Sequence, residues 1–383
     1  MLTNLIKISL FFSLAILVWF IYPREVNKNL PVVGEELKIE FPEETFDTDT
    51  VLEEKVKTEN QTKEENKAKP TVEKIEVVSK KTSSDNQNPV NSEQPKNTNS
   101  TKESGDFVEL NEKSRKSIVN ILCKTNGNDL STITGTGVII DPRGIILTNA
   151  HIGQYFLLKD FKFKNFVECT IRTGEPAYPK YEAELVYISP EWVEANKSIL
   201  TEENPKGTGE YDFAFLRITK AIDGTVLPSF DYIKPDTREI IDEGEPVLLA
   251  SYPAGFLGSI SVIQGLYITS AVTTVQKIFT FKETTIDLLS VGGTVLSQKG
   301  SSGGAVIDRY GKLIGLISTS SDGDTTSERD LRAITMTHIN RSLKESFGGL
   351  NSFLGLNMET TADIFKKTLF PSLSQLIINE LKK

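Results

Sequence analysis

The sequence predicts an all-β fold over residues 106–345, arranged as an antiparallel sandwich or a pair of barrels. Three observations lead to this prediction. Short apolar runs recur through the region, turn residues separate them, and no long helical period comes between them. The runs expected to form strands are 117–122, 137–140, 145–147, 212–218, 246–250, 261–268, 305–307 and 313–317.

Three polar residues stand beside these runs in the order His151, Asp212 and Ser302. His151 follows an apolar run, Asp212 begins another, and Ser302 lies between glycines. A serine hydroxyl is a poor nucleophile until an imidazole takes its proton, and the imidazole needs a carboxylate to orient it. The pattern predicts nucleophilic catalysis by Ser302, with His151 as the base and Asp212 as its orienting group.

The turn at Gly300, Ser301 and Ser302 is the expected oxyanion hole. A glycine turns the chain tightly, so the N–H groups of Gly300 and Ser302 can point at a developing negative charge. The second histidine, His338, has no partner recognisable in the sequence, and we interpret it as structural.

Three segments resemble the signature segments of trypsin-like serine proteases, with the closest likeness to the bacterial HtrA-like branch. They are Thr-Asn-Ala-His at 148–151, Asp-Phe-Ala-Phe-Leu at 212–216 and Gly-Ser-Ser-Gly-Gly at 300–304. The spacing Gly-x-Ser-Gly-Gly selects Ser302 rather than Ser301 as the nucleophile. Segments 135–140, 244–250 and 311–318 resemble further strands of the family, so the likeness spans residues 107–345.

The resemblance implies two antiparallel six-stranded Greek-key barrels with the active site between them. His151 and Asp212 would come from the first barrel and Ser302 from the second. Many relatives carry a peptide-binding PDZ domain after the protease, and the tail of this chain is too short for one. The substrates implied are polypeptides, and no metal or organic cofactor is implied.

The family topology would make the strands of Cys123 and Cys169 neighbours in the first barrel. The two cysteines could form a disulfide there or remain two buried free thiols, and the sequence leaves both states open. The resemblance also places Leu296 near the floor of the substrate pocket, with Ser318, Thr319 and Ser320 as one wall. Because none of these residues is acidic, we expect cleavage after a small or medium apolar residue rather than after Lys or Arg.

The two ends of the chain differ from its centre. Residues 8–22 are almost entirely apolar, and no small-residue cleavage site precedes Pro23, so we expect residues 1–23 to be a transmembrane signal-anchor; a cleaved signal peptide is the alternative. Residues 24–105 are charged and polar and are predicted to be a disordered linker. The tail 346–383 has helical spacing, and we expect short helices packed on the second barrel.

The net charge of −9 argues against nucleic-acid binding as the main role. We therefore expect a single-pass membrane serine endopeptidase whose protease domain lies outside the cytoplasm; its oligomeric state is open. The alternatives are a catalytically silent module with this fold that acts in binding or as a chaperone-like module on the cell surface, and an enzyme that cleaves esters.

Overall fold

The computed structural model describes residues 106–383 except 128, 203–206, 240, 256, 283 and 322. The expected signal-anchor at 1–23 and the expected linker at 24–105 lie outside the described residues. Within the part that is described, no helix has the length and apolarity that a membrane crossing requires.

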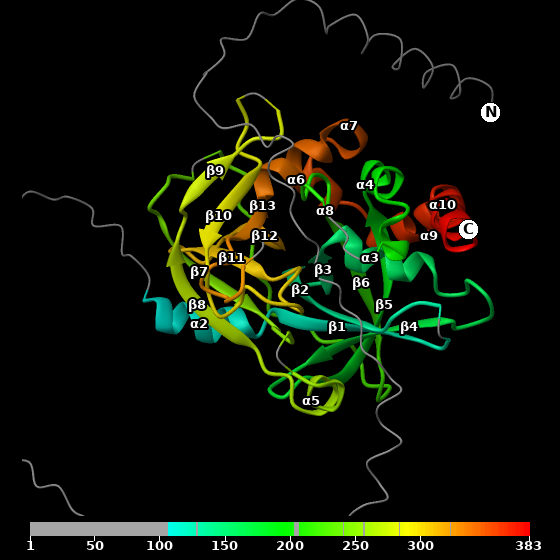
Figure 1. Cartoon of the computed structure of the whole chain (residues 1–383). Helices are drawn as coiled ribbons and strands as arrows, with labels where there is room; N and C mark the ends of the chain where they lie inside the picture. The colour runs from blue at the N-terminus through cyan, green and yellow to red at the C-terminus, as the bar shows by residue number, and fades with distance from the viewer. Residues whose placement is uncertain are drawn as a thin grey trace, which may run out of the picture. The chain divides into compact units, whose positions relative to one another are not determined.

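The first half of the described chain is a closed barrel of six antiparallel strands, as expected from the resemblance (Figure 1). Apolar residues such as Ile121, Ile146 and Leu216 are fully buried in its strands. The chain leaves β3, adds β4 and β5, and returns with β6 beside β3, which is a Greek-key path. In barrel order the strands are β1 (Ile118–Thr125), β2 (Ile133–Asp141), β3 (Ile145–Thr148), β6 (Ala214–Ala221), β5 (Tyr178–Ile188) and β4 (Val167–Thr173).

The second half corrects the expectation of a second six-stranded barrel, because it is a curled half-barrel of seven strands. The short strand β9 pairs with β10 and adds an edge beyond the expected six. Strands β8 and β9 are the two edges of this sheet and do not pair with each other. The Thr273 hydroxyl on β8 donates to the carbonyl of Val291 on β10 at 3.1 Å, so a side-chain hydrogen bond lies where a closed barrel would have backbone pairing. In sheet order the strands are β8 (Thr269–Thr274), β7 (Pro246–Ser251), β11 (Ala305–Asp308), β12 (Leu313–Ser320), β13 (Leu331–Thr335), β10 (Leu288–Gly292) and β9 (Lys277–Phe279).

The prediction of a strand at 261–268 is wrong, because helix α5 (Ser259–Gln264) occupies its first half and the second half forms no strand. The cause is a side chain far away in the sequence. The buried guanidinium of Arg172 on β4 donates to the carbonyls of Val262 and Ile263 at 3.0 and 2.8 Å. These carbonyls lie in the last turn of the helix, where they have no helical partner. Capping from the first barrel therefore favours a helix over a strand.

The other regular elements of the described chain are short helices. The C-terminal ones were expected on the second barrel, and this is wrong: α9 packs against β5, and α10 packs against α3 and α4, all on the first-barrel side (Figure 1). The Ser374 hydroxyl of α10 donates to the carbonyl of Leu157 in α3 at 2.7 Å. Phe365 of α9 lies edge-on to Tyr187 of β5, so the apolar sides of these helices meet aromatic surface there. The helices are α2 (Phe107–Arg115), α3 (Ala150–Leu157), α4 (Pro190–Ala195), the 3-10 helix η3 (Ile199–Thr201), α6 (Met336–Ser342), α7 (Lys344–Phe347), α8 (Leu350–Leu354), α9 (Met358–Thr368) and α10 (Phe370–Leu381).

Candidate active site

His151 lies in the first turn of α3, immediately after the end of β3. Its backbone N–H donates to Asp212 Oδ1 at 2.9 Å, and its ring Nδ1 lies 2.9 Å from Asp212 Oδ2. One carboxylate thus holds both the backbone and the ring of the histidine, which fixes the orientation of the imidazole.

Asp212 lies in the turn before β6 and is completely buried. Besides the two groups of His151, its Oδ2 accepts a hydrogen bond from the Ser318 hydroxyl at 2.7 Å. Its backbone carbonyl accepts from the Asn149 side-chain amide at 3.0 Å. These hydrogen bonds satisfy the buried oxygens of Asp212 and hold the residue in one orientation.

Ser318 was expected in the wall of the substrate pocket, and its hydroxyl is instead turned to Asp212. It comes from β12 of the half-barrel and therefore links the two halves at the buried carboxylate. No local pattern in the sequence predicts this contact, because the two residues are 106 positions apart.

Ser302 lies in the turn before β11 and is 3% exposed. Its carbonyl accepts a hydrogen bond from the backbone N–H of Thr136 on β2 at 2.8 Å. A Cβ added to Gly303 would come within 1.9 Å of the Thr136 carbonyl oxygen and 2.6 Å of Thr148 Oγ1. The serine turn therefore lies directly against the first barrel, beside Thr148, three residues before His151.

The expected oxyanion turn has the backbone conformation that its glycine allows. Gly300 has a φ of +87°, a backbone angle that residues other than glycine rarely adopt. The N–H of Ser302 donates to no backbone oxygen of the residues described here. Ser301 is buried, and its hydroxyl accepts from Ser251 on β7 at 3.0 Å, so this side chain braces the turn from inside.

The other residues expected in the substrate pocket are buried to different degrees. Leu296 is fully buried in an apolar cluster that also contains Ile317, Leu331 and Ala333. Thr319 is 1% exposed, whereas Ser320 is half-buried at the end of β12. The floor expected at Leu296 is thus apolar.

Cys123 and Cys169 are cross-strand partners on β1 and β4 and form a disulfide, with the sulfur atoms 2.05 Å apart. Of the two states that the sequence left open, the structure contains the bridge. Among the residues with described positions, no group of His, Cys, Asp and Glu could hold a metal ion.

His338 has a partner that the sequence did not reveal. Its ring Nδ1 lies 3.1 Å from Oδ1 of Asp287, and both residues are buried. Asp287 lies 51 positions earlier, directly before β10, in a segment without a recognisable motif.

Residues 135–316 match the family model of the trypsin-like peptidase domain. The chain contains a trypsin-like peptidase domain. The matched residues include His151, Asp212 and Ser302 as well as the first five strands of the half-barrel with β12 up to Leu316. No curated protein matches the sequence of the chain.

Solved structures with a similar fold are HtrA-type and Deg serine proteases. The peptidase chain is 18% identical to the protein titled Deg5 (64% of this chain, 95% of that one, TM-score 0.41). It is 19% identical to a serine endoprotease from Yersinia pestis (63% and 65%, TM-score 0.38). It is 16% identical to the HtrA-type protease AlgW with a decapeptide (62% and 67%, TM-score 0.41).

Proposed function

We propose that this peptidase domain is a serine endopeptidase that works through an acyl-enzyme intermediate. Ser302 Oγ attacks the carbonyl carbon of the scissile peptide bond while His151 Nε2 accepts the hydroxyl proton. The imidazolium then gives this proton to the leaving amine. Water hydrolyses the ester by the same proton transfers, and Ser302 is restored.

The observation that carries the proposal is the hydrogen bonding of the Asp212 carboxylate. It accepts from the backbone of His151 and lies against ring Nδ1 of that residue. This arrangement leaves Nε2 as the basic atom of the imidazole and stabilises the imidazolium. The position of the serine turn, bonded to Thr136 of the same barrel, supports Ser302 as the nucleophile.

The oxyanion of the tetrahedral intermediate would be held by the N–H groups of Gly300 and Ser302. Donors aimed at a charge that develops only during the reaction lower its barrier without tightening substrate binding. For the substrate, we propose a polypeptide with a small or medium apolar residue before the scissile bond. The support for this preference is the buried, uncharged surroundings of Leu296.

We further propose that the domain acts outside the cytoplasm, tethered through the expected signal-anchor at 1–23. Support for an oxidising compartment comes from the disulfide between Cys123 and Cys169, since such bonds are rare in the cytosol. The signal-anchor itself lies outside the described residues.

The test is covalent labelling with a fluorophosphonate probe together with peptide hydrolysis. We expect Ser302→Ala to abolish labelling and to lower kcat/KM at least about 10⁴-fold. The matched control is Ser342→Ala, which removes the hydroxyl lying 3.5 Å from Nε2 of the other histidine, and it should label like the wild type.

Absence of labelling in the wild type under all conditions would instead favour a silent binding module with the same fold. Labelling accompanied by hydrolysis of esters but of no peptide would favour an esterase.

A further inference from the structure

The residue before Asp212 has an unusual backbone conformation. Tyr211 has a φ of +59°, in the left-handed region that favours glycine. Its carbonyl accepts from the N–H of Phe213 at 2.7 Å, and the N–H of Asp212 donates to the carbonyl of Gly209 at 3.2 Å. A tyrosine keeps such a conformation only where its surroundings hold it there.

The surroundings that hold Tyr211 come from the half-barrel side. Its ring lies 5.5 Å from the ring of His338 on α6, and its hydroxyl accepts from Lys282 Nζ at 3.4 Å. Phe281 also packs edge-on against the His338 ring, with the ring centroids 5.0 Å apart. The histidine thus contacts two aromatic rings, and one of them belongs to Tyr211, the residue before the catalytic aspartate.

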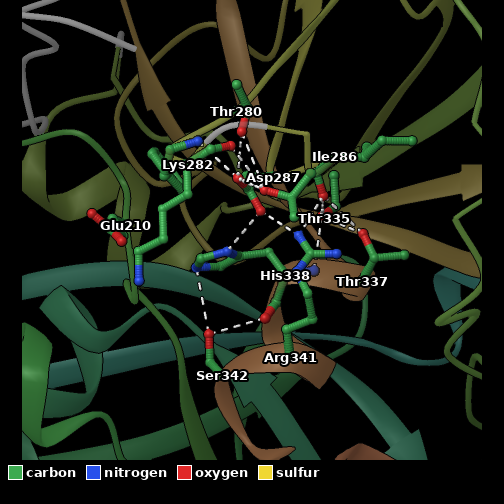
Figure 2. A network of polar contacts seen from close by, with 12 residues as sticks. Glu210, Thr280, Lys282, Ile286, Asp287, Thr335, Thr337, His338, Arg341 and Ser342 are labelled. Atoms are coloured by element: carbon green, nitrogen blue, oxygen red, sulfur yellow. Dashed lines mark hydrogen bonds and ion pairs between the residues drawn. The ribbon is translucent and has the colours of Figure 1, made fainter. Parts of the chain in front are cut away.

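Asp287 holds His338 in this position (Figure 2). Its Oδ1 faces Nδ1 of His338 and also accepts from Arg341. Its Oδ2 accepts from the Thr285 hydroxyl at 2.6 Å and from the backbone N–H of Phe281 at 2.7 Å. A buried carboxylate with this many donors forms a rigid network, because moving it would leave several polar groups unpaired.

The same network contains a second row of serine, histidine and aspartate, since Ser342 Oγ lies 3.5 Å from His338 Nε2. This row is not arranged for catalysis. The Ser342 hydroxyl donates to the carbonyl of His338 within its own helix at 2.9 Å, and Arg341 shares the carboxylate. A structural role therefore fits the row better than a second nucleophile.

We infer that Asp287 and His338 are positioning residues that brace Tyr211 and thereby fix the turn that presents Asp212 to His151. The brace runs from the half-barrel to the first barrel, from one histidine–aspartate pair to the other. The inference rests on the proposed function, in which the alignment of Asp212 with His151 sets the rate.

The test replaces the strained residue by glycine, which adopts a positive φ readily and so should fold. In Tyr211→Gly the turn loses the ring that the brace holds. Since a misplaced catalytic group costs about 10²-fold, we expect kcat to fall about 10- to 100-fold while KM stays within about twofold. His338→Ala should act in the same direction. Tyr211→Phe keeps the ring and loses only the contact with Lys282, so its kcat should lie between those of the wild type and Tyr211→Gly.

The second readout needs no turnover. The chain has only two histidines, so NMR of protein labelled at histidine gives the ring nitrogen resonances of two imidazoles, and His338→Gln assigns them. Asp212 Oδ2 lies 2.9 Å from Nδ1 of His151, so in Tyr211→Gly, where this contact should loosen, the Nδ1 resonance of His151 should shift. The matched control is Asn165→Gly, which replaces another residue of positive φ, 60°, in a loop of the first barrel.

A Tyr211→Gly protein with wild-type kcat and an unshifted Nδ1 resonance of His151 would overturn the brace, and so would an equal effect of Asn165→Gly. If the wild type hydrolysed nothing and did not label, the proposed function would fail. The Nδ1 resonance of His151 would then still decide whether the brace positions Asp212.

Discussion

Gly300 illustrates how single residues set the geometry of the proposed oxyanion hole. A Cβ at this position would lie 2.6 Å from the carbonyl oxygen of Tyr252 and 2.9 Å from the nitrogen of Ala254. Both atoms are backbone atoms, which cannot move aside as the end of a flexible side chain can. Glycine is therefore required here for space as well as for its positive φ.

We predict that Gly300→Ala lowers kcat/KM by at least about 10²-fold, because the turn shifts and one oxyanion donor is lost. Its thermal stability should fall as well. The control is Gly224→Ala, which has a similar φ of +76° but nothing within 4 Å of the added Cβ. Peptide hydrolysis and thermal unfolding measure the two effects, and a Gly300→Ala enzyme as active as Gly224→Ala would contradict the assignment.

At the scale of elements, the C-terminal helices complete the core beside the strand that follows Asp212. Phe353 of α8 is fully buried, with its ring 4.7 Å from that of Phe215 on β6 and 4.9 Å from that of Phe347. Tyr187 of β5 contacts the same cluster. The tail is thus a structural part of the half that carries His151 and Asp212.

We predict that Phe353→Ala lowers the free energy of unfolding by about 3–5 kcal/mol, because it opens a cavity among these rings. Ile364→Ala on α9 is the control, since Ile364 is 57% exposed and its loss should change stability by less than about 0.5 kcal/mol. Urea unfolding measures both variants. Equal midpoints for the two would show that the tail is not part of the cooperative core.

At the scale of the whole molecule, buried polar contacts join the barrel to the half-barrel around the site. Ser318 reaches Asp212, Thr136 binds the Ser302 turn, and His338 packs on Tyr211. Hydrogen bonds to a buried charge are costly to break, so loss of the charge of Asp287, which holds His338, should weaken the association of the halves.

Asp287 allows this to be tested through pH. Burial alone would raise the pKa of Asp287, but the hydrogen bonds from His338 and Thr285 outweigh it and lower the pKa below its usual value. In the unfolded chain the pKa of an aspartate is about 3.9. Below this pH the folded state therefore binds fewer protons at Asp287 than the unfolded state does. The stability that Asp287 contributes is full above this pH and is lost as the pH falls toward the folded pKa.

We predict that Asp287→Asn is less stable than the wild type by about 1–3 kcal/mol at pH 7, and that the difference shrinks at pH 3. Urea unfolding at the two pH values measures it. Asp308→Asn is the control, because burial raises the pKa of Asp308. Its stability relative to the wild type should be higher at pH 7 than at pH 3, which is the opposite of the change expected for Asp287→Asn. A gap between wild type and Asp287→Asn that is equal at both pH values would refute the pairing.

Local patterns in the sequence predicted much of this structure. Apolar runs located most strands, and the segments around His151, Asp212 and Ser302 located the candidate site before any fold was known. The prediction failed where a distant residue intervenes. Arg172 bonds the last carbonyls of α5 in the segment expected as a strand, and its contact with Val262 spans 90 positions.

The sequence by itself therefore determined the residue types of the site and the turns that hold them, because glycine placement and strand periodicity act over a few residues. Only the tertiary structure decided which distant groups meet: Ser318 with Asp212, Asp287 with His338, and the tail with the first barrel. These pairings depend on burial, which makes polar contacts strong and unpaired groups costly, and burial exists only once the chain has folded.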